Sequence, residues 1–199
     1  GIVRDIALAR GRRTRHITPP PNIGELDHVP DPRSISGAPA PRHLTKHEFL
    51  TGMRCHRALW WMVHEPGCQE LVPDRADQAR MQTGRDVGAA ARERVPGGVL
   101  IGPAFQGVEA RAEATRRAMG SGAPVVYEAT FSTGYLAISA DILLREGNGW
   151  ALIEVKSASS VKPEHVADAA YQAWVARQAG VDIVGVELMH LNTECRYPA

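Results

Sequence analysis

The chain has 199 residues, of which 23 are basic, 22 are acidic and 44% are hydrophobic. These values are typical of a globular protein, and the length allows one domain with a sizeable core plus an extended arm. The net charge of +1 does not by itself indicate a nucleic-acid binder, and no apolar run approaches the length that spans a membrane. We therefore expect a cytoplasmic protein without a membrane partner.

The first 43 residues predict a flexible basic arm in front of a folded domain at 44–199. The run Pro19-Pro20-Pro21 interrupts this segment, which shows no sustained apolar period. Residues 1–46 hold eight basic side chains against four acidic ones. A basic arm can hold phosphate groups, and a solvated tail explains the same composition at least as well.

After the arm, the sequence predicts helices first and strands second. Thr45 is placed to cap a helix, with Glu48 as its capping-box partner. Further helices are predicted over 75–94, 107–119 and 163–179, and strands over 125–131, 137–144, 150–157 and 183–191. This order indicates a mixed α/β domain. Core or core-edge positions, rather than base-stacking platforms, are expected for Trp60, Trp61, Trp150 and Trp174.

Two carboxylates face each other across the hairpin predicted at 146–149. If Gly147 and Asn148 are the central pair of its turn, Asp141 lies directly opposite Glu154. Like charges at such a position destabilise a sheet. A bound divalent cation is the simplest reason for the pair, because Mg²⁺ prefers carboxylate oxygens.

The preceding turn adds a third acid to that face. Centring it on Thr133-Gly134 pairs Glu128 with Ser139, which lies two residues before Asp141 and shares its face. The opposite face of the meander is apolar and predicts the core.

A lysine joins the three acids. Lys156 stands two residues after Glu154 and so shares its face. It is one of only three lysines among the 23 basic residues, and a compact ammonium group suits the task of orienting a water or helping to deprotonate it. A surface ion pair with Glu154 would explain the lysine alone. Together with the acids, it predicts a metal site.

The helices carry weaker signals for nucleic-acid binding. His165, Asp168 and Gln172 recur along one helix at helical spacing, with Tyr171 beside them. We expect Gln172 to meet the metal face or a DNA backbone, although a solvated helix face explains these residues about as well. On the helix at 75–94, Arg85 is a candidate guide for backbone phosphates.

Four short segments form a wider pattern: Glu128-Ala-Thr-Phe, Ala140-Asp141-Ile-Leu, Ile153-Glu154-Val155-Lys156-Ser157 and Asp168-Ala-Ala-Tyr171-Gln172. Together with the segment 44–60, they resemble the RecB-like branch of the PD-(D/E)XK nuclease superfamily. That branch includes the CRISPR-associated RecB-like exonucleases and a bacterial group that is still more similar. The likeness spans roughly 44–192.

The resemblance implies a restriction-endonuclease-like fold, in which a central mixed sheet is flanked by helices. It also implies that Asp141, Glu154 and the carbonyl of Val155 bind Mg²⁺ or Mn²⁺, while Lys156 acts on the nucleophilic water. Gln172 corresponds to the glutamine of the family's helix motif. DNA, as single strands or duplex ends, is the implied partner and substrate, in repair, recombination or defence.

The chain departs from the family pattern in three places. Gly88 stands where relatives carry a metal-binding histidine, and Ala176 stands where they carry a tyrosine. An intact iron–sulfur cluster within this chain is not expected, because Cys55 has only Cys195 as a late companion where relatives have three cysteines. Glu128 is a candidate substitute for the missing histidine.

Three functions remain open from the sequence. The first is a Mg²⁺- or Mn²⁺-dependent nuclease that acts on DNA. The second is a non-catalytic nucleic-acid-binding or assembly module, which the residues at 88 and 176 favour and the set of Asp141, Glu154 and Lys156 disfavours. The third is the nuclease portion of a larger protein, truncated at its C-terminus, whose missing region or protein partner would complete the activity.

Overall fold

The computed structural model describes residues 8–10, 42–102 and 105–192. Its helices are α1 (Lys46–Arg54), α2 (His56–His64), the short 3-10 helix η2 (Gln69–Leu71), α3 (Arg75–Arg94), α4 (Val108–Gly120) and α5 (Pro163–Gln178). Its strands are β1 (Leu8–Arg10), β2 (Leu44–Thr45), β3 (Gly98–Leu100), β4 (Val125–Thr133), β5 (Leu136–Glu146), β6 (Gly149–Lys156) and β7 (Ile183–Leu191). The predicted helices and strands end within about two residues of the observed ones.

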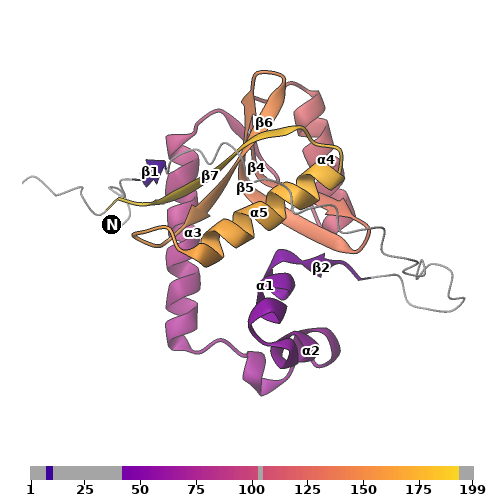
Figure 1. Cartoon of the computed structure of the whole chain (residues 1–199), viewed down its shortest axis with the longest axis vertical. Helices are drawn as coiled ribbons and strands as arrows, with labels where there is room; N and C mark the ends of the chain where they lie inside the picture. The colour runs from indigo at the N-terminus through magenta and orange to yellow at the C-terminus, as the bar shows by residue number, and fades with distance from the viewer. Residues whose placement is uncertain (1–7, 11–41, 103–104, 193–199) are drawn as a thin grey trace, which may run out of the picture.

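The strands form one mixed sheet in the order β1-β7-β6-β5-β4-β3, with β2 beside β5 (Figure 1). Strands β4, β5 and β6 are the predicted antiparallel meander, and β7 runs parallel to β6. The connection from β6 to β7 passes through α5, since parallel neighbours require a long crossover. The expected α/β class, with a mixed sheet flanked by helices, is confirmed.

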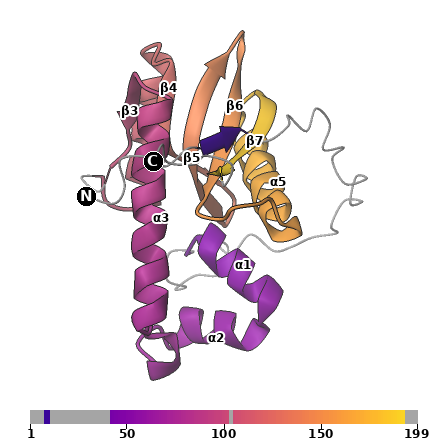
Figure 2. The same ribbon diagram turned by 90° about the vertical axis from the view of Figure 1, so that its left-hand side faces the viewer.

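Helices cover both faces of this sheet. Figure 2 shows α3 and α5 on opposite sides of the strands. Ala91 of α3 belongs to a cluster that contains Ile142 and Ile153, whereas the larger cluster, which includes residues of α4 and α5, contains Leu143 and Leu152. The expectation of one apolar and one polar face is therefore wrong. Both sets of alternating residues are apolar, and α4 and α5 cover Leu143 and Leu152 on the face that was expected to be polar.

The β5–β6 hairpin has the predicted register. Ile142 pairs with Ile153, as a two-residue turn at 147–148 requires. One step further along the same register, Asp141 on β5 lies at the level of Glu154 on β6.

The β4–β5 hairpin has a different register from the predicted one. Its turn begins one residue later, at Gly134, whose φ of 53° suits the first central position of a tight hairpin turn. Ser139 consequently pairs with Thr130, and the predicted pairing of Ser139 with Glu128 is wrong.

Glu128 interrupts the regular alternation of β4. Its φ of 56° makes it the one non-glycine residue with a positive φ in the described ranges. Tyr127 packs in the cluster under α3, whereas Ala129 packs in the cluster under α4 and α5. The two faces of β4 therefore exchange at Glu128. The flanking pairs with β5 leave Glu128 at the level of Asp141.

Helix α1 begins with the predicted cap. The hydroxyl of Thr45 accepts a hydrogen bond from the Glu48 amide at 3.3 Å, and the Glu48 carboxylate accepts one from the Thr45 amide at 2.8 Å. Leu44 and Thr45 also pair with β5 as strand β2. This pairing anchors the first turn of α1 beside the middle of the sheet.

Most of the predicted arm lies outside the described residues. Leu8–Arg10 form β1, which pairs antiparallel with β7, whereas the structure does not describe residues 1–7 and 11–41. Cys195 also lies outside the described ranges. Within them, no helix combines the length and the apolar character needed to cross a membrane.

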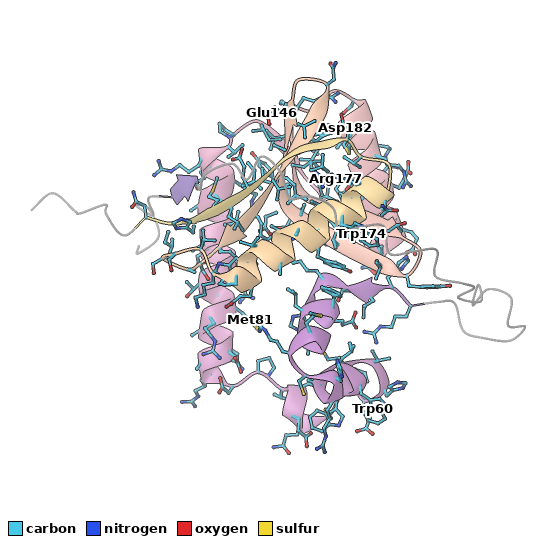
Figure 3. The ribbon with its side chains drawn as sticks, viewed as in Figure 1. Trp60, Met81, Glu146, Trp174, Arg177 and Asp182 are labelled. Atoms are coloured by element: carbon cyan, nitrogen blue, oxygen red, sulfur yellow. The ribbon has the colours of Figure 1, made fainter. Side chains whose placement is uncertain are left out.

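Two of the tryptophans are not core residues. Trp150 is buried in the larger cluster, but Trp60 on α2 and Trp174 on α5 are 49% and 41% exposed (Figure 3). Ala173 and Val175 on either side of Trp174 are buried, and the face of α5 at Trp174 turns away from the sheet.

Candidate functional site

The two predicted carboxylates occupy neighbouring strands at the centre of the sheet. Glu154 is 1% exposed, and Asp141 is half-buried. One oxygen of Asp141 accepts a hydrogen bond from the amide of Val155 at 2.7 Å, which ties the carboxylate of β5 to β6. The structure therefore brings Asp141, Glu154 and Val155 together, as the sequence predicts.

Burial and mutual repulsion perturb the two carboxylates in opposite directions. Burial and the negative charge of Glu154 raise the pKa of Asp141 to about 8. Burial alone would raise the pKa of Glu154 as well, but the ammonium groups of Lys46 and Lys156 outweigh it and lower that pKa to about 2. At neutral pH the pair thus holds one carboxylate that is charged and another that resists ionisation unless more positive charge arrives.

Two lysines converge on Glu154. Lys156 donates to its Oε1 at 2.7 Å and also contacts Asp168. Lys46, from the first turn of α1, donates to the same oxygen at 2.9 Å and lies 3.8 Å from the Asp168 carboxylate. Burial lowers the pKa of both lysines, but Glu154 and its acidic neighbours outweigh this effect and raise it. Both lysines are therefore positively charged at neutral pH.

Sequence reasoning missed Lys46 as a site residue. A signal was present, because lysine is rare in this chain and Lys46 directly follows the helix cap at Thr45. The short strand β2 that places it beside β5 gives no such signal. Lys46 and Glu154 are 108 residues apart in the chain.

Gln172 lies at the site and not on a solvated helix face. Its Nε2 donates to Glu154 Oε2 at 2.6 Å and to Asp168 Oδ1 at 2.9 Å, and both Gln172 and Asp168 are buried. The amide oxygen Oε1 of Gln172 is buried without a hydrogen-bond partner in the described part of the chain. Helix α5 thus contributes an acid and an amide that fix the orientation of Glu154 and Lys156.

Glu128 and Arg85 lie on the other side of Asp141. Both line a pocket of about 500 Å³ that also contains the side chain of Asp141. Glu128 lies 3.7 Å from Arg92, and its negative charge contributes to the raised pKa of Asp141. The left-handed backbone at Glu128 costs about 1–3 kcal/mol for a residue with a side chain. Strain of this kind at the level of Asp141 marks Glu128 as a functional candidate.

Tyr171, a candidate nucleic-acid-binding residue, packs between helices α1 and α5. Its ring stacks on Phe49 of α1, with centroids 3.9 Å apart and planes 6° from parallel. Together with Lys156 and Asp168 it lines a second pocket, of about 420 Å³, between α1 and α5. Burial raises the pKa of the Tyr171 hydroxyl. In this structure its ring joins α1 to α5.

The residues fit a hard divalent cation in their chemistry. Asp141, Glu154 and Glu128 offer carboxylate oxygens, the ligands that Mg²⁺ and Mn²⁺ prefer. Burial and the charge of Glu154 raise the pKa of Asp141 more than the nearby Lys46 ammonium lowers it, so a further cation would favour the charged carboxylate. No three His, Cys, Asp or Glu side chains of the described ranges form a metal-binding group. Glu154 pairs with two lysines, and Glu128 lies near Arg92.

Comparisons with protein-family models, with curated proteins and with solved structures find no match to this chain. The resemblance to RecB-like nucleases therefore rests on the residues of the chain itself.

Proposed function

We propose that this chain is a Mg²⁺- or Mn²⁺-dependent nuclease with a restriction-endonuclease-like core, which hydrolyses phosphodiester bonds of DNA. The observation that supports it best is the meeting of Asp141, Glu154, Lys156 and Gln172 from β5, β6 and α5 in one partly buried cluster. These are the residues on which the resemblance to RecB-like nucleases depends. DNA as the substrate rests on that resemblance.

The acids would hold the cation. Asp141, Glu154, Glu128 and the carbonyl of Val155 are the residues assigned to it. When bound, the metal would supply Lewis-acid polarisation of the scissile phosphate and of the attacking water.

Lys156 would orient the attacking water and stabilise the negative charge that develops on the phosphate. Its carboxylate neighbours raise its pKa, so it is positively charged in the metal-free protein, as charge stabilisation requires. Asp168 and Gln172 hold Lys156 and Glu154 in place through their hydrogen bonds. Lys46 pairs with the same Glu154 oxygen as Lys156.

The test is digestion of end-labelled linear DNA, single-stranded and duplex, in Mg²⁺, Mn²⁺ or EDTA. We expect metal-dependent cleavage by the wild type and a loss of about 10²-fold or more in Lys156→Gln. Lys162→Gln is the matched control, because Lys162 is an exposed lysine only six residues away. Calorimetric titration of Mn²⁺ should show binding that disappears in an Asp141→Ala/Glu154→Ala double variant. Full cleavage by Lys156→Gln would overturn the mechanism.

A non-catalytic nucleic-acid-binding module is the second candidate. The ion pairs of Lys46 and Lys156 with Glu154 favour this candidate, because a metal ion would have to compete with both lysines for the carboxylate. DNA binding that persists in EDTA, with no cleavage in any metal, would support this module and exclude the nuclease. Mn²⁺ binding without cleavage would support either this inactive module or the nuclease portion of a larger protein.

A further inference from the structure

The pocket beside Asp141 carries opposite charges on its two sides. It has a volume of about 500 Å³ and lies between α3, α4, β4, β5 and the segment that follows β3. Strands β4 and β5 contribute the acids Glu128 and Asp141. Helices α3 and α4 contribute the arginines Arg85, Arg92 and Arg111. Such a pocket suits an anionic ligand, which would bind the arginines directly and the acids through a bridging cation.

Arg85 donates to Gln82 through Nε and Nη2, whereas Arg92 and Arg111 have fewer partners among the described residues. Arg111 donates through Nε to Thr130 Oγ1 at 3.1 Å, which orients the guanidinium but does not use its Nη groups. Nη1 of Arg92 lies 3.7 Å from the carboxylate of Glu128, beyond hydrogen-bond distance. Among the described residues, these guanidinium groups are thus left with donors for a ligand. Guanidinium groups bind phosphate through paired hydrogen bonds.

Two glycines of α3 keep the pocket open. Gly84 and Gly88 lie one turn apart and both line it. A Cβ at Gly84 would meet nothing within 4 Å, and a Cβ at Gly88 would meet only Arg92 Nη1, at 3.9 Å. Neither glycine is required by close packing, although glycine inside a helix is less stable than alanine. The space above these positions is therefore a feature that a ligand can use.

We propose that this pocket binds a backbone phosphate of a polynucleotide strand through Arg92 and Arg111, with the exposed Arg85 next along the strand. The inference rests on the proposed function, because it places that phosphate beside Asp141. The volume of about 500 Å³ is several times that of one phosphate group, and arginines from two helices line it. A piece of strand fits this arrangement better than a free phosphate ion.

The test is the binding of a fluorescein-labelled single-stranded oligonucleotide, followed by anisotropy in EDTA so that no cleavage occurs. Arg92→Gln and Arg111→Gln are each expected to weaken binding about 10-fold, the effect of one hydrogen bond to a charged group. The slope of log affinity against log salt concentration should decrease by about 0.7 for each phosphate that a variant no longer binds. Arg116→Gln is the matched control, because Arg116 lies on α4 but is exposed and pairs with Glu113.

A second variant keeps the test informative if an arginine variant folds poorly. Gly88→Leu replaces a helix glycine with a good helix former, so it should raise the unfolding temperature while its side chain blocks the pocket and weakens binding. Unchanged affinity in the two arginine variants and in Gly88→Leu would overturn the inference. Inorganic phosphate that competes as well as unlabelled oligonucleotide, phosphate for phosphate, would also overturn it.

This binding assay separates the inference from the proposed nuclease function. If no metal supports cleavage and binding still depends on Arg92 and Arg111, the phosphate-binding pocket is supported and the nuclease function is rejected. If the wild type cleaves DNA and the arginine variants bind it normally, the nuclease function is supported and the phosphate-binding pocket is rejected.

Discussion

Replacing Glu128 by glycine is expected to give a more stable protein than replacing it by alanine, the reverse of the usual order in a strand. Both variants remove the carboxylate and its interaction with Arg92, so these effects cancel in the comparison. The two variants differ in how readily each residue adopts the φ of 56° at this position.

The size of the difference follows from two opposing terms. An L-residue with a Cβ is disfavoured by about 1–2 kcal/mol in the left-handed region, and glycine is not. Glycine loses about 0.5–1 kcal/mol more conformational entropy than alanine on folding. The middle values of the two terms differ by about 0.75 kcal/mol, so Glu128→Gly should exceed Glu128→Ala in stability by about that amount.

Urea unfolding in EDTA measures this difference. With a slope of about 2 kcal/mol per molar, the midpoint of Glu128→Gly should lie about 0.3–0.5 M above that of Glu128→Ala. Ser139→Gly and Ser139→Ala are the matched control pair in regular strand β5, where alanine should be the more stable. If alanine is also the more stable at position 128, the strain at Glu128 is refuted. Both variants at 128 should bind Mn²⁺ more weakly than the wild type.

Three further predictions concern the buried charges. Gln172→Leu removes the donor shared by Glu154 and Asp168 and should destabilise the protein by about 1–3 kcal/mol in urea unfolding; wild-type stability would contradict those hydrogen bonds. The pKa of Glu154 is lowered from 4.5 to about 2, so its stabilising effect is present above pH 4.5 and is lost as pH falls towards 2. Lys46→Met should raise that pKa and shift acid unfolding, followed by circular dichroism, to higher pH, and an unmoved midpoint would exclude the ion pair. The pKa of Asp141 is raised from 3.8 to about 8, so ionising it destabilises the metal-free fold as pH rises through this range. Thermal unfolding should accordingly show Asp141→Asn more stable than the wild type at pH 9 but not at pH 4. Mn²⁺ should stabilise only the wild type. If Asp141→Asn is more stable by the same amount at both pH values, the raised pKa of Asp141 is contradicted.

The sequence by itself determined the long helices, the four long strands and the central pair of acids. Alternating residues and a Gly147-Asn148 turn specify the β5–β6 hairpin, and that hairpin alone places Asp141 beside Glu154. The cap at Thr45 and the bounds of α3 and α5 were likewise predictable. Each of these features depends on residues within a few positions of one another, so their physical causes are contained in a short stretch of sequence.

The tertiary structure decided what surrounds the acids. Lys46 reaches Glu154 only because β2 pairs with β5, and Gln172 meets Glu154 only because α5 packs on the face opposite α3. The exchange of faces at Glu128 places its carboxylate in the pocket near Arg92, and no alternation pattern contains that exchange. These arrangements depend on the packing of segments far apart in the chain. Because such packing is selected by the shape and charge of whole elements together, the local pattern of any single segment does not specify it.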